Sequence, residues 1–176
     1  SSDLWIGSPS RDTSVGAVWT ATTPVRTIQD AMKQEVIVGG TASSNDTGLF
    51  PTILNEFIGT KFKSVLGYKS TIEVEFAMEK GEVHGKIGWT WGSLHSTRTA
   101  DWVSSKKVAV LLQLALAKSP KIPAEIPNAL DLATSEMGRQ VMSLVFAPGD
   151  MGNPAFMGPN VPRERVEAIR AAYAKT

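Results

Sequence analysis

The organisation of the chain follows from one segment, Val36-Ile37-Val38-Gly39-Gly40-Thr41-Ala42-Ser43-Ser44-Asn45-Asp46-Thr47. Its three consecutive β-branched residues are typical of a strand that is buried on both faces. The two glycines then allow a sharp turn and the close approach of another molecule. Apolar residues at helical spacing follow, and Pro51 fits such a helix only in its first turn. We therefore expect a helix that begins near Thr47 or Gly48.

A strand that leads into a helix through a loop of small and hydroxylic residues indicates an anion pocket. Free backbone N–H groups at a helix start carry partial positive charge and favour an anion. Uncharged hydroxyl donors are added by Thr41, Ser43, Ser44 and Thr47. The alternative is a capped helix with a polar loop in water, which is the commoner arrangement. Asp46 favours this alternative, because its carboxylate would repel an anion unless it faces away.

Length and composition describe an ordinary globular protein. The 176 residues are enough for one domain with a core; 42% are hydrophobic and 20% are charged. A net charge of +1 gives no nucleic-acid footprint. The chain has no Cys, which excludes disulfides, and no apolar run near the roughly 20 residues that span a bilayer. Because the first residue is Ser rather than Met, we expect a processed product or a fragment.

The pattern along the chain predicts three consecutive strand–loop–helix units. They comprise strands at 36–39, 62–66 and 83–91 and helices at 48–58, 71–80 and 94–104. Such units imply parallel strands joined by right-handed crossovers. The loops at 40–47, 67–71 and 88–93 should then meet at one edge of the sheet, where ligands bind in α/β folds. This convergence favours the pocket over the capped helix.

Further elements are expected on either side of these units. The pattern predicts strands at 4–7, 15–20 and 108–112, helices at 27–33, 129–133, 135–146 and from 162 onward, and an irregular loop over 148–162. The strand at 108–112 is the most apolar run, so we expect it at the centre of the sheet. Gly59 and Gly81 stand where helix C-cap glycines belong.

Motifs for catalysis, nucleotide binding and zinc are absent from the sequence. We therefore expect no catalytic residue, no metal and no cofactor. His84 and His95 are better explained as surface or hydrogen-bonded side chains than as metal ligands. In an extended segment Trp89 and Trp91 point to opposite faces, so one could line the cleft, or both could pack in the core. An acidic cluster is expected to form a solvated face rather than an acid–base pair; it comprises Glu73, Glu75, Glu79 and Glu82.

Several motifs, taken in order, resemble the extracytoplasmic receptors of tripartite tricarboxylate transporters, the Bug family. They are Thr27-Ile28-Gln29-Asp30-Ala31, Val36-Ile37-Val38-Gly39-Gly40-Thr41, Gly59-Thr60-Lys61-Phe62-Lys63, Gly67-Tyr68, Ala77-Met78-Glu79-Lys80-Gly81-Glu82-Val83-His84-Gly85, Ala147-Pro148-Gly149 and Val161-Pro162-Arg163-Glu164-Arg165-Val166. The chain departs from the family pattern at three points. Its first loop holds less Gly, and the family often has Asp where His84 stands and Gly where Ser70 stands.

The resemblance implies a periplasmic binding protein-like (type II) α/β fold with a mostly parallel sheet flanked by helices. Family members are much longer and hold a small carboxylate between two lobes. We therefore expect the chain to be chiefly a second lobe at 15–114, with 1–14 and the C-terminal helices of 115–176 belonging to the first lobe. The predicted ligand-binding residues are Thr41, Ala42, Ser43, Ser44, Asn45, Thr47, Tyr68, Lys69, Ser70, Thr71 and Trp89.

The first functional hypothesis is a periplasmic receptor fragment that captures a small organic carboxylate or related solute by lobe closure. Its partner would be the membrane permease of the transporter, with no nucleic acid, and exposed apolar surface would favour self-association of the fragment. The alternative is an effector-binding domain of a bacterial transcription regulator, although no DNA-binding helix-turn-helix is visible. A small hydrolase or isomerase is disfavoured, because no nucleophile–base pairing is present.

Overall fold

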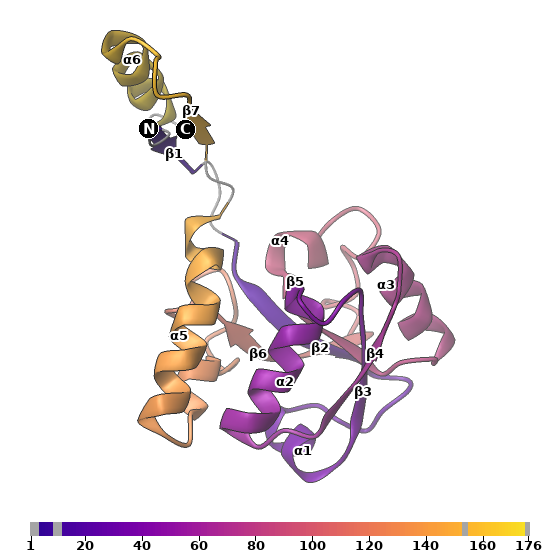
Figure 1. Cartoon of the computed structure of the whole chain (residues 1–176). Helices are drawn as coiled ribbons and strands as arrows, with labels where there is room; N and C mark the ends of the chain where they lie inside the picture. Colours follow the sequence, from indigo (N-terminus) through magenta and orange to yellow (C-terminus); the bar gives the residue numbers. More distant parts are fainter. Residues whose placement is uncertain (1–3, 9–11, 153–154, 175–176) are drawn as a thin grey trace.

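A computed structural model describes residues 4–8, 12–152 and 155–174 (Figure 1). The strands are β1 (Leu4–Gly7), β2 (Ser14–Trp19), β3 (Val36–Gly40), β4 (Phe62–Leu66), β5 (Gly85–Thr90), β6 (Val108–Leu114) and β7 (Ala155–Met157). The helices are α1 (Ile28–Lys33), α2 (Asp46–Ile58), α3 (Thr71–Lys80), α4 (Trp91–Leu94), the 3-10 helix η1 (Ala129–Leu132), α5 (Glu136–Met151) and α6 (Arg163–Tyr173). None of the helices in these ranges is long and apolar enough to cross a membrane.

The main body is built on a five-stranded sheet with the order β4-β3-β5-β2-β6. β3 pairs in parallel with both β4 and β5, as the three consecutive units require. β2 pairs antiparallel with β5 and with β6, so four of the five strands run in one direction and β2 opposes them. The expected α/β class with a mostly parallel sheet is confirmed.

The position of β6 corrects one expectation. Its apolar run predicted a central strand, whereas β6 lies at an edge of the sheet. The run remains buried because the chain returns along that edge: the Gln113 N–H donates to the Pro127 carbonyl at 2.8 Å, and Gln113 forms a parallel bridge with Asn128. A covered edge strand is as apolar as a central one.

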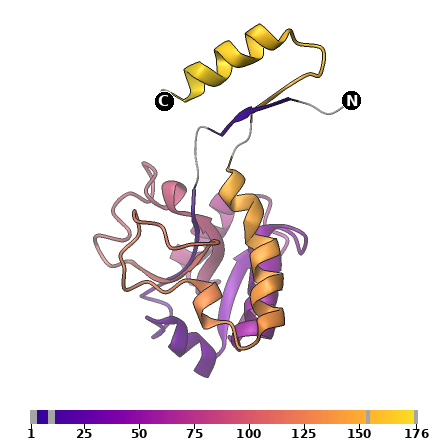
Figure 2. The ribbon, with the colours of Figure 1, turned by 90° about the vertical axis from the view of Figure 1, so that its left-hand side faces the viewer.

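Two clusters of buried side chains cover the two faces of the sheet. Alternation along β2 places Val18 in one cluster and Val15 and Ala17 in the other. The first cluster includes side chains from α1, α2, η1 and α5, and the second includes those of α3. The helices therefore sandwich the sheet, with α2 and α5 on one side and α3 on the other (Figures 1 and 2).

Local signals in the sequence give the expected helix ends. Thr27 and Asp30 form a complete capping box at the start of α1. Ser70 caps α3, since its Oγ accepts the Glu73 N–H at 3.2 Å. Gly59 and Gly81 end α2 and α3 with φ of 84° and 79°, a conformation that favours glycine.

The two prolines inside helices lie deeper in them than expected. α2 begins at Asp46, so Pro51 lies in its second turn rather than its first. Pro51 has no N–H group and cannot donate to the Thr47 carbonyl. That carbonyl oxygen instead faces Gly40, and a Cβ atom added at Gly40 would lie 2.8 Å from it. α5 likewise continues through Pro148 to Met151, and β7 follows, where an irregular loop was expected.

The helix expected over 94–104 is absent. α4 covers only Trp91–Leu94, and turns follow up to residue 106. Side chains there bond to the backbone instead: the Thr99 hydroxyl donates to the Ser93 carbonyl at 3.0 Å, and the Ser105 hydroxyl donates to the Asp101 carbonyl. Such bonds compete with helix formation, which explains the difference.

β1, β7 and α6 form a separate unit that projects from the main body (Figures 1 and 2). β1 pairs antiparallel with β7, and the Arg170 guanidinium of α6 donates to the Trp5 carbonyl at 2.9 Å. α5, in contrast, packs on α2 within the body, where the Phe50 and Phe146 rings meet edge to face at 5.3 Å. The assignment of 1–14 and 115–176 to a first lobe stays a prediction.

Candidate functional site

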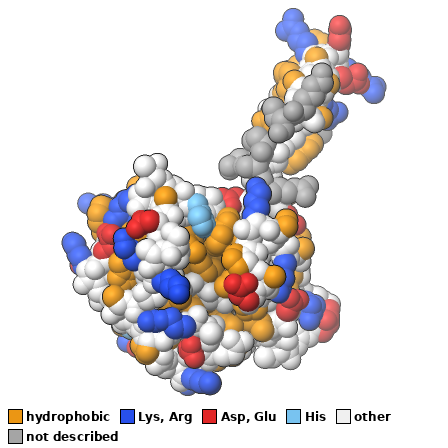
Figure 3. All heavy atoms as spheres, turned by 180° about the vertical axis from the view of Figure 1, so that it is seen from behind, with side chains coloured by type: hydrophobic (Ala, Val, Ile, Leu, Met, Phe, Trp, Pro, Cys, Tyr) orange, Lys and Arg blue, Asp and Glu red, His pale blue; other side chains and the backbone are white. Residues whose placement is uncertain are grey.

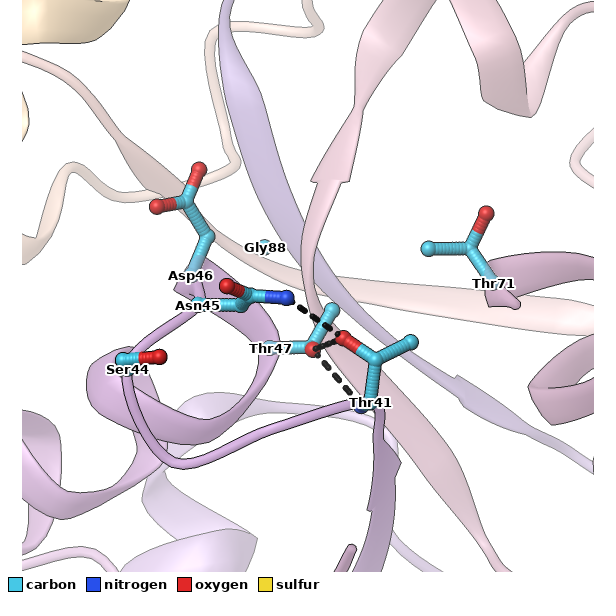
Figure 4. A pocket seen from close by; sticks show the side chains of 7 residues that line it. All are labelled: Thr41, Ser44, Asn45, Asp46, Thr47, Thr71 and Gly88. Carbon is cyan, nitrogen blue, oxygen red and sulfur yellow. Dashed lines mark hydrogen bonds between the residues drawn. The ribbon is translucent and has the colours of Figure 1, made fainter. Parts of the chain in front are cut away.

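The loops after β3, β4 and β5 meet at one edge of the sheet, as the topology requires. At this edge the loop after β3, the first residue of α3 and Gly88 within β5 line an open cavity of about 400 Å³ at the start of α2 (Figure 4). Its lining residues are Thr41, Ser44, Asn45, Asp46, Thr47, Thr71 and Gly88. The wall is therefore mainly hydroxylic, with an amide and a carboxylate.

Hydrogen bonds between side chains hold the first loop in shape (Figure 4). Thr47 is buried, and its Oγ1 accepts the Thr41 backbone N–H at 3.1 Å. The Asn45 amide donates to Thr41 Oγ1 at 3.0 Å, and the two threonine hydroxyls lie 3.4 Å apart. Because these groups bond to one another, the cavity wall is ordered before any ligand arrives.

The two helices that start at the cavity differ in their caps. At α3 the Ser70 hydroxyl accepts the Glu73 N–H, and the Glu73 carboxylate accepts the Lys69 N–H at 2.8 Å. At α2 the N-cap residue Asn45 makes no capping bond with its side chain. The start of α2 therefore offers backbone N–H groups to an external acceptor, whereas at α3 the Glu73 N–H is satisfied by the Ser70 side chain.

Asp46 is the charged residue of the wall. It is exposed, yet partial burial of its carboxyl raises the pKa above the ordinary value. Its carboxylate points away from the hydrogen-bonded hydroxyls of Thr41 and Thr47 (Figure 4). The repulsion expected from this residue is therefore reduced at the hydroxyl cluster, although the carboxylate still lines the cavity.

Five of the predicted ligand-binding residues line the cavity, namely Thr41, Ser44, Asn45, Thr47 and Thr71. Ala42, Ser43, Tyr68, Lys69, Ser70 and Trp89 do not. Asp46 and Gly88 line it without having been predicted. Gly88 has φ of 81°, and a Cβ atom there would lie 3.1 Å from the Cβ of Asp46. Gly88 lies in the middle of an apolar strand, and this position was the signal in the sequence for a close approach between the backbone of β5 and Asp46.

Trp89 lies in the core rather than the cleft. Its side chain is 1% exposed, packs edge to face on Trp102 at 5.9 Å, and lies beneath the Lys86 ammonium at 4.4 Å from the ring centre. Trp91 begins α4 and packs against the His95 ring at 4.2 Å. His84 is hydrogen-bonded, since its Nδ1 accepts the Ile37 N–H at 3.1 Å.

The acidic cluster on α3 is only partly a solvated face. Glu75 is buried and bonds through separate oxygens to Lys86 and to Arg98, each at 3.1 Å. Arg98 also pairs with Glu79. The expectation of a solvated face was wrong for Glu75, because its cationic partners are distant in sequence and no local pattern reveals them. In the described ranges, no group of three metal-ligating side chains could hold a metal ion.

On the face opposite to that of Figure 1, lysine and arginine side chains are scattered among acidic ones (Figure 3). The described part of this face therefore offers no basic stripe along which a phosphate backbone could bind.

Comparison with solved structures identifies the architecture. A protein from R. palustris with adipate matches 98% of this chain and 53% of its own, with a TM-score of 0.63 and 14% identity. The chain has the fold of solute-binding proteins. A TctC solute-binding protein from Polaromonas without ligand matches with a TM-score of 0.57 and 15% identity, over 98% of this chain and 52% of its own. A periplasmic transporter matches with a TM-score of 0.53 and 15% identity, over 98% and 54%.

These solved structures are neighbours of the type that the sequence motifs resemble, and the expected binding-protein fold is confirmed. The chain spans about half the length of the solved proteins that it matches. No protein-family model matches the chain, and no curated protein matches it.

Proposed function

We propose that this chain is the ligand-binding lobe of an extracytoplasmic receptor for a small organic carboxylate. One observation carries the proposal: the loop after β3, the start of α3 and Gly88 of β5 converge on a cavity lined mainly by hydroxyls, at the start of α2, which its own N-cap side chain leaves uncapped. The R. palustris neighbour with adipate supports a carboxylate as the ligand class.

The binding mechanism needs no covalent step. The ligand carboxylate accepts hydrogen bonds from the N–H groups at the start of α2 and from hydroxyls of the wall. A second lobe then closes over the open cavity and excludes water, and the closed receptor delivers its ligand to a membrane permease. In this proposal the protein is periplasmic and acts by binding rather than by catalysis.

A thermal-shift assay with adipate tests the proposal. Carboxylate binding should raise the unfolding temperature of the chain, and the gain should grow with the logarithm of ligand concentration above the dissociation constant. The shift should fall in Thr71→Val, because Thr71 lines the cavity and valine keeps its shape without the hydroxyl. Thr97→Val is the matched control, since Thr97 is exposed and lies outside the cavity wall. Equal shifts in both variants would place binding elsewhere.

A further inference from the structure

The cavity has an unusual charge for a carboxylate site. Among the described residues, those that line it include one anion, Asp46, and no lysine or arginine. Lys86 and Arg98 are paired away from the wall: Lys86 is buried against Glu75, and Arg98 pairs with Glu75 and Glu79. Lys69, which could have supplied a positive charge, does not line the cavity. A dianionic ligand would therefore meet a negative wall without a compensating cation.

Asp46 is also a carboxylate without an internal partner. Across the described ranges, its side chain forms no hydrogen bond or ion pair. The neighbouring Asp12 differs, because both of its oxygens accept the Gly92 N–H, at 3.0 and 3.1 Å. Partial burial raises the Asp46 pKa, as expected for a carboxylate that loses water and gains nothing in return. Because Asp46 is exposed, water hydrates this carboxylate, and a ligand that donates to it would replace that water.

The place of Asp46 fits a ligand with two unlike ends. Its carboxylate points away from the Thr41 and Thr47 hydroxyls, so the anion-binding groups and the acidic group occupy different parts of one wall (Figure 4). Asp46 also lines an adjoining hollow of about 360 Å³, together with Asp12, Ser14, Thr90 and Gly149. A ligand whose carboxylate lies at the start of α2 can therefore extend its other end past Asp46.

We propose that Asp46 is a specificity-determining residue, and that the site prefers carboxylates that carry an ammonium or similar donor group over dicarboxylates. This inference rests on the proposed function. The carboxylate of the ligand binds at the start of α2. The ammonium group of the same ligand donates to the Asp46 carboxylate, so that the two form a charge-assisted hydrogen bond. A second carboxylate in the same place would be repelled and would leave Asp46 without a donor.

The test compares ligands that share three methylene groups. Amide chemical shifts of the whole chain are followed by NMR during titration with 4-aminobutanoate, with glutarate, and with pentanoate as a ligand whose far end is apolar. We expect the wild type to bind 4-aminobutanoate about tenfold more tightly than glutarate, as for one charge pair at an exposed site. In Asp46→Asn this preference should disappear. Asp131→Asn is the matched control and should retain it, because Asp131 is exposed and lines neither the cavity nor the adjoining hollow.

The possible results separate the two proposals. Binding of glutarate as tightly as 4-aminobutanoate by the wild type, or an unchanged preference in Asp46→Asn, would overturn the specificity assignment and leave the carboxylate site intact. Loss of the preference in Asp131→Asn as well would show that the net charge of the protein, rather than Asp46 itself, sets the preference, and would also overturn the role of Asp46. If none of the ligands shifts the amides of the cavity wall, the proposed function fails, and the inference fails with it.

Discussion

Thr47 contributes both to the stability of the loop after β3 and to the wall of the cavity. It lines the cavity, and its Oγ1 also accepts the Thr41 N–H at 3.1 Å from a buried position. Thr71 lines the same cavity from an exposed position, and its hydroxyl forms no bond within the described ranges. Both threonines therefore line the cavity, but only the Thr47 hydroxyl also forms a hydrogen bond that holds the loop.

Thr47→Val should therefore lower the free energy of unfolding by about 1 to 3 kcal/mol, because it leaves the Thr41 N–H without an acceptor. Thr71→Val should change the free energy of unfolding by less than about 0.5 kcal/mol. Urea unfolding of both variants measures the difference. Equal losses of stability would show that the Thr47 bond does not hold the loop.

The ion pairs of Glu75 predict an order of stability among variants. Burial lowers the pKa of Lys86, whereas the Glu75 carboxylate acts to raise it. Glu75→Leu leaves a 2% exposed ammonium without its partner and should cost about 3 to 5 kcal/mol. Lys86→Met should cost less, because Glu75 keeps Arg98 at 3.1 Å. Guanidinium unfolding measures both, and the reverse order would contradict this account of the network.

At the scale of elements, the cap of α1 responds to pH. The pKa of Asp30 is lowered by the Arg26 N–H, then by the Thr27 hydroxyl and the Thr27 N–H, all of which donate to its carboxylate. Since the folded pKa lies below the unfolded value of 3.8, the stabilisation is present above pH 3.8 and is lost as pH falls through the folded pKa.

Asp30→Ala should consequently lower the urea unfolding midpoint above pH 3.8, and the gap to wild type should shrink as the solution becomes more acidic. Midpoints recorded on either side of that pH measure the trend. A gap that stays constant with pH would mean that the charge of Asp30 adds nothing to the cap.

The elements also show how far the sequence predicts this fold. Strands with β-branched runs and helices with a polar cap were predictable, because their signals lie within a few residues. The continuation of α5 through Pro148 was not, because packing of α5 against α2 outweighs the cost of the proline. The edge position of β6 was missed, because the segment that covers it follows later in the chain.

The same distinction applies to the site. The loops after the strands were predictable from topology, and five predicted residues line the cavity. Lys69 and Ser70 were placed there by their loop, but both contribute to the Glu73 cap of α3 instead. Trp89 was assigned to the cleft because side chains alternate between the two faces of a strand. Alternation does not tell which face of β5 is turned toward Trp102 in the core.

At the scale of the whole molecule, exposed apolar side chains gather outside the cavity. Trp5 and Phe156 of the projecting unit are 41% and 53% exposed, and Leu144 of α5 is 76% exposed. Hydrophobic side chains are visible on the projecting unit in Figure 3. Such surface is typical of a region that another polypeptide covers.

We expect the isolated chain to self-associate as its concentration rises, and Leu144→Glu to weaken that association. The variant should keep the unfolding temperature of the wild type at low concentration, because the side chain is largely in solvent. Sedimentation equilibrium measures the association. A chain that stays monomeric at every concentration would show that this apolar surface is tolerated in water.

The central claim is that residues 41–47, Thr71 of α3 and Gly88 of β5 form a carboxylate site, and an amide chemical-shift map with adipate tests it most directly. The account predicts saturable shifts at the amides of Asp46, Thr47, Thr71 and Gly88 and at their neighbours in these loops. Saturable shifts at the cavity between Gln113 and Ala124, or no saturable shift in any assigned amide, would contradict it.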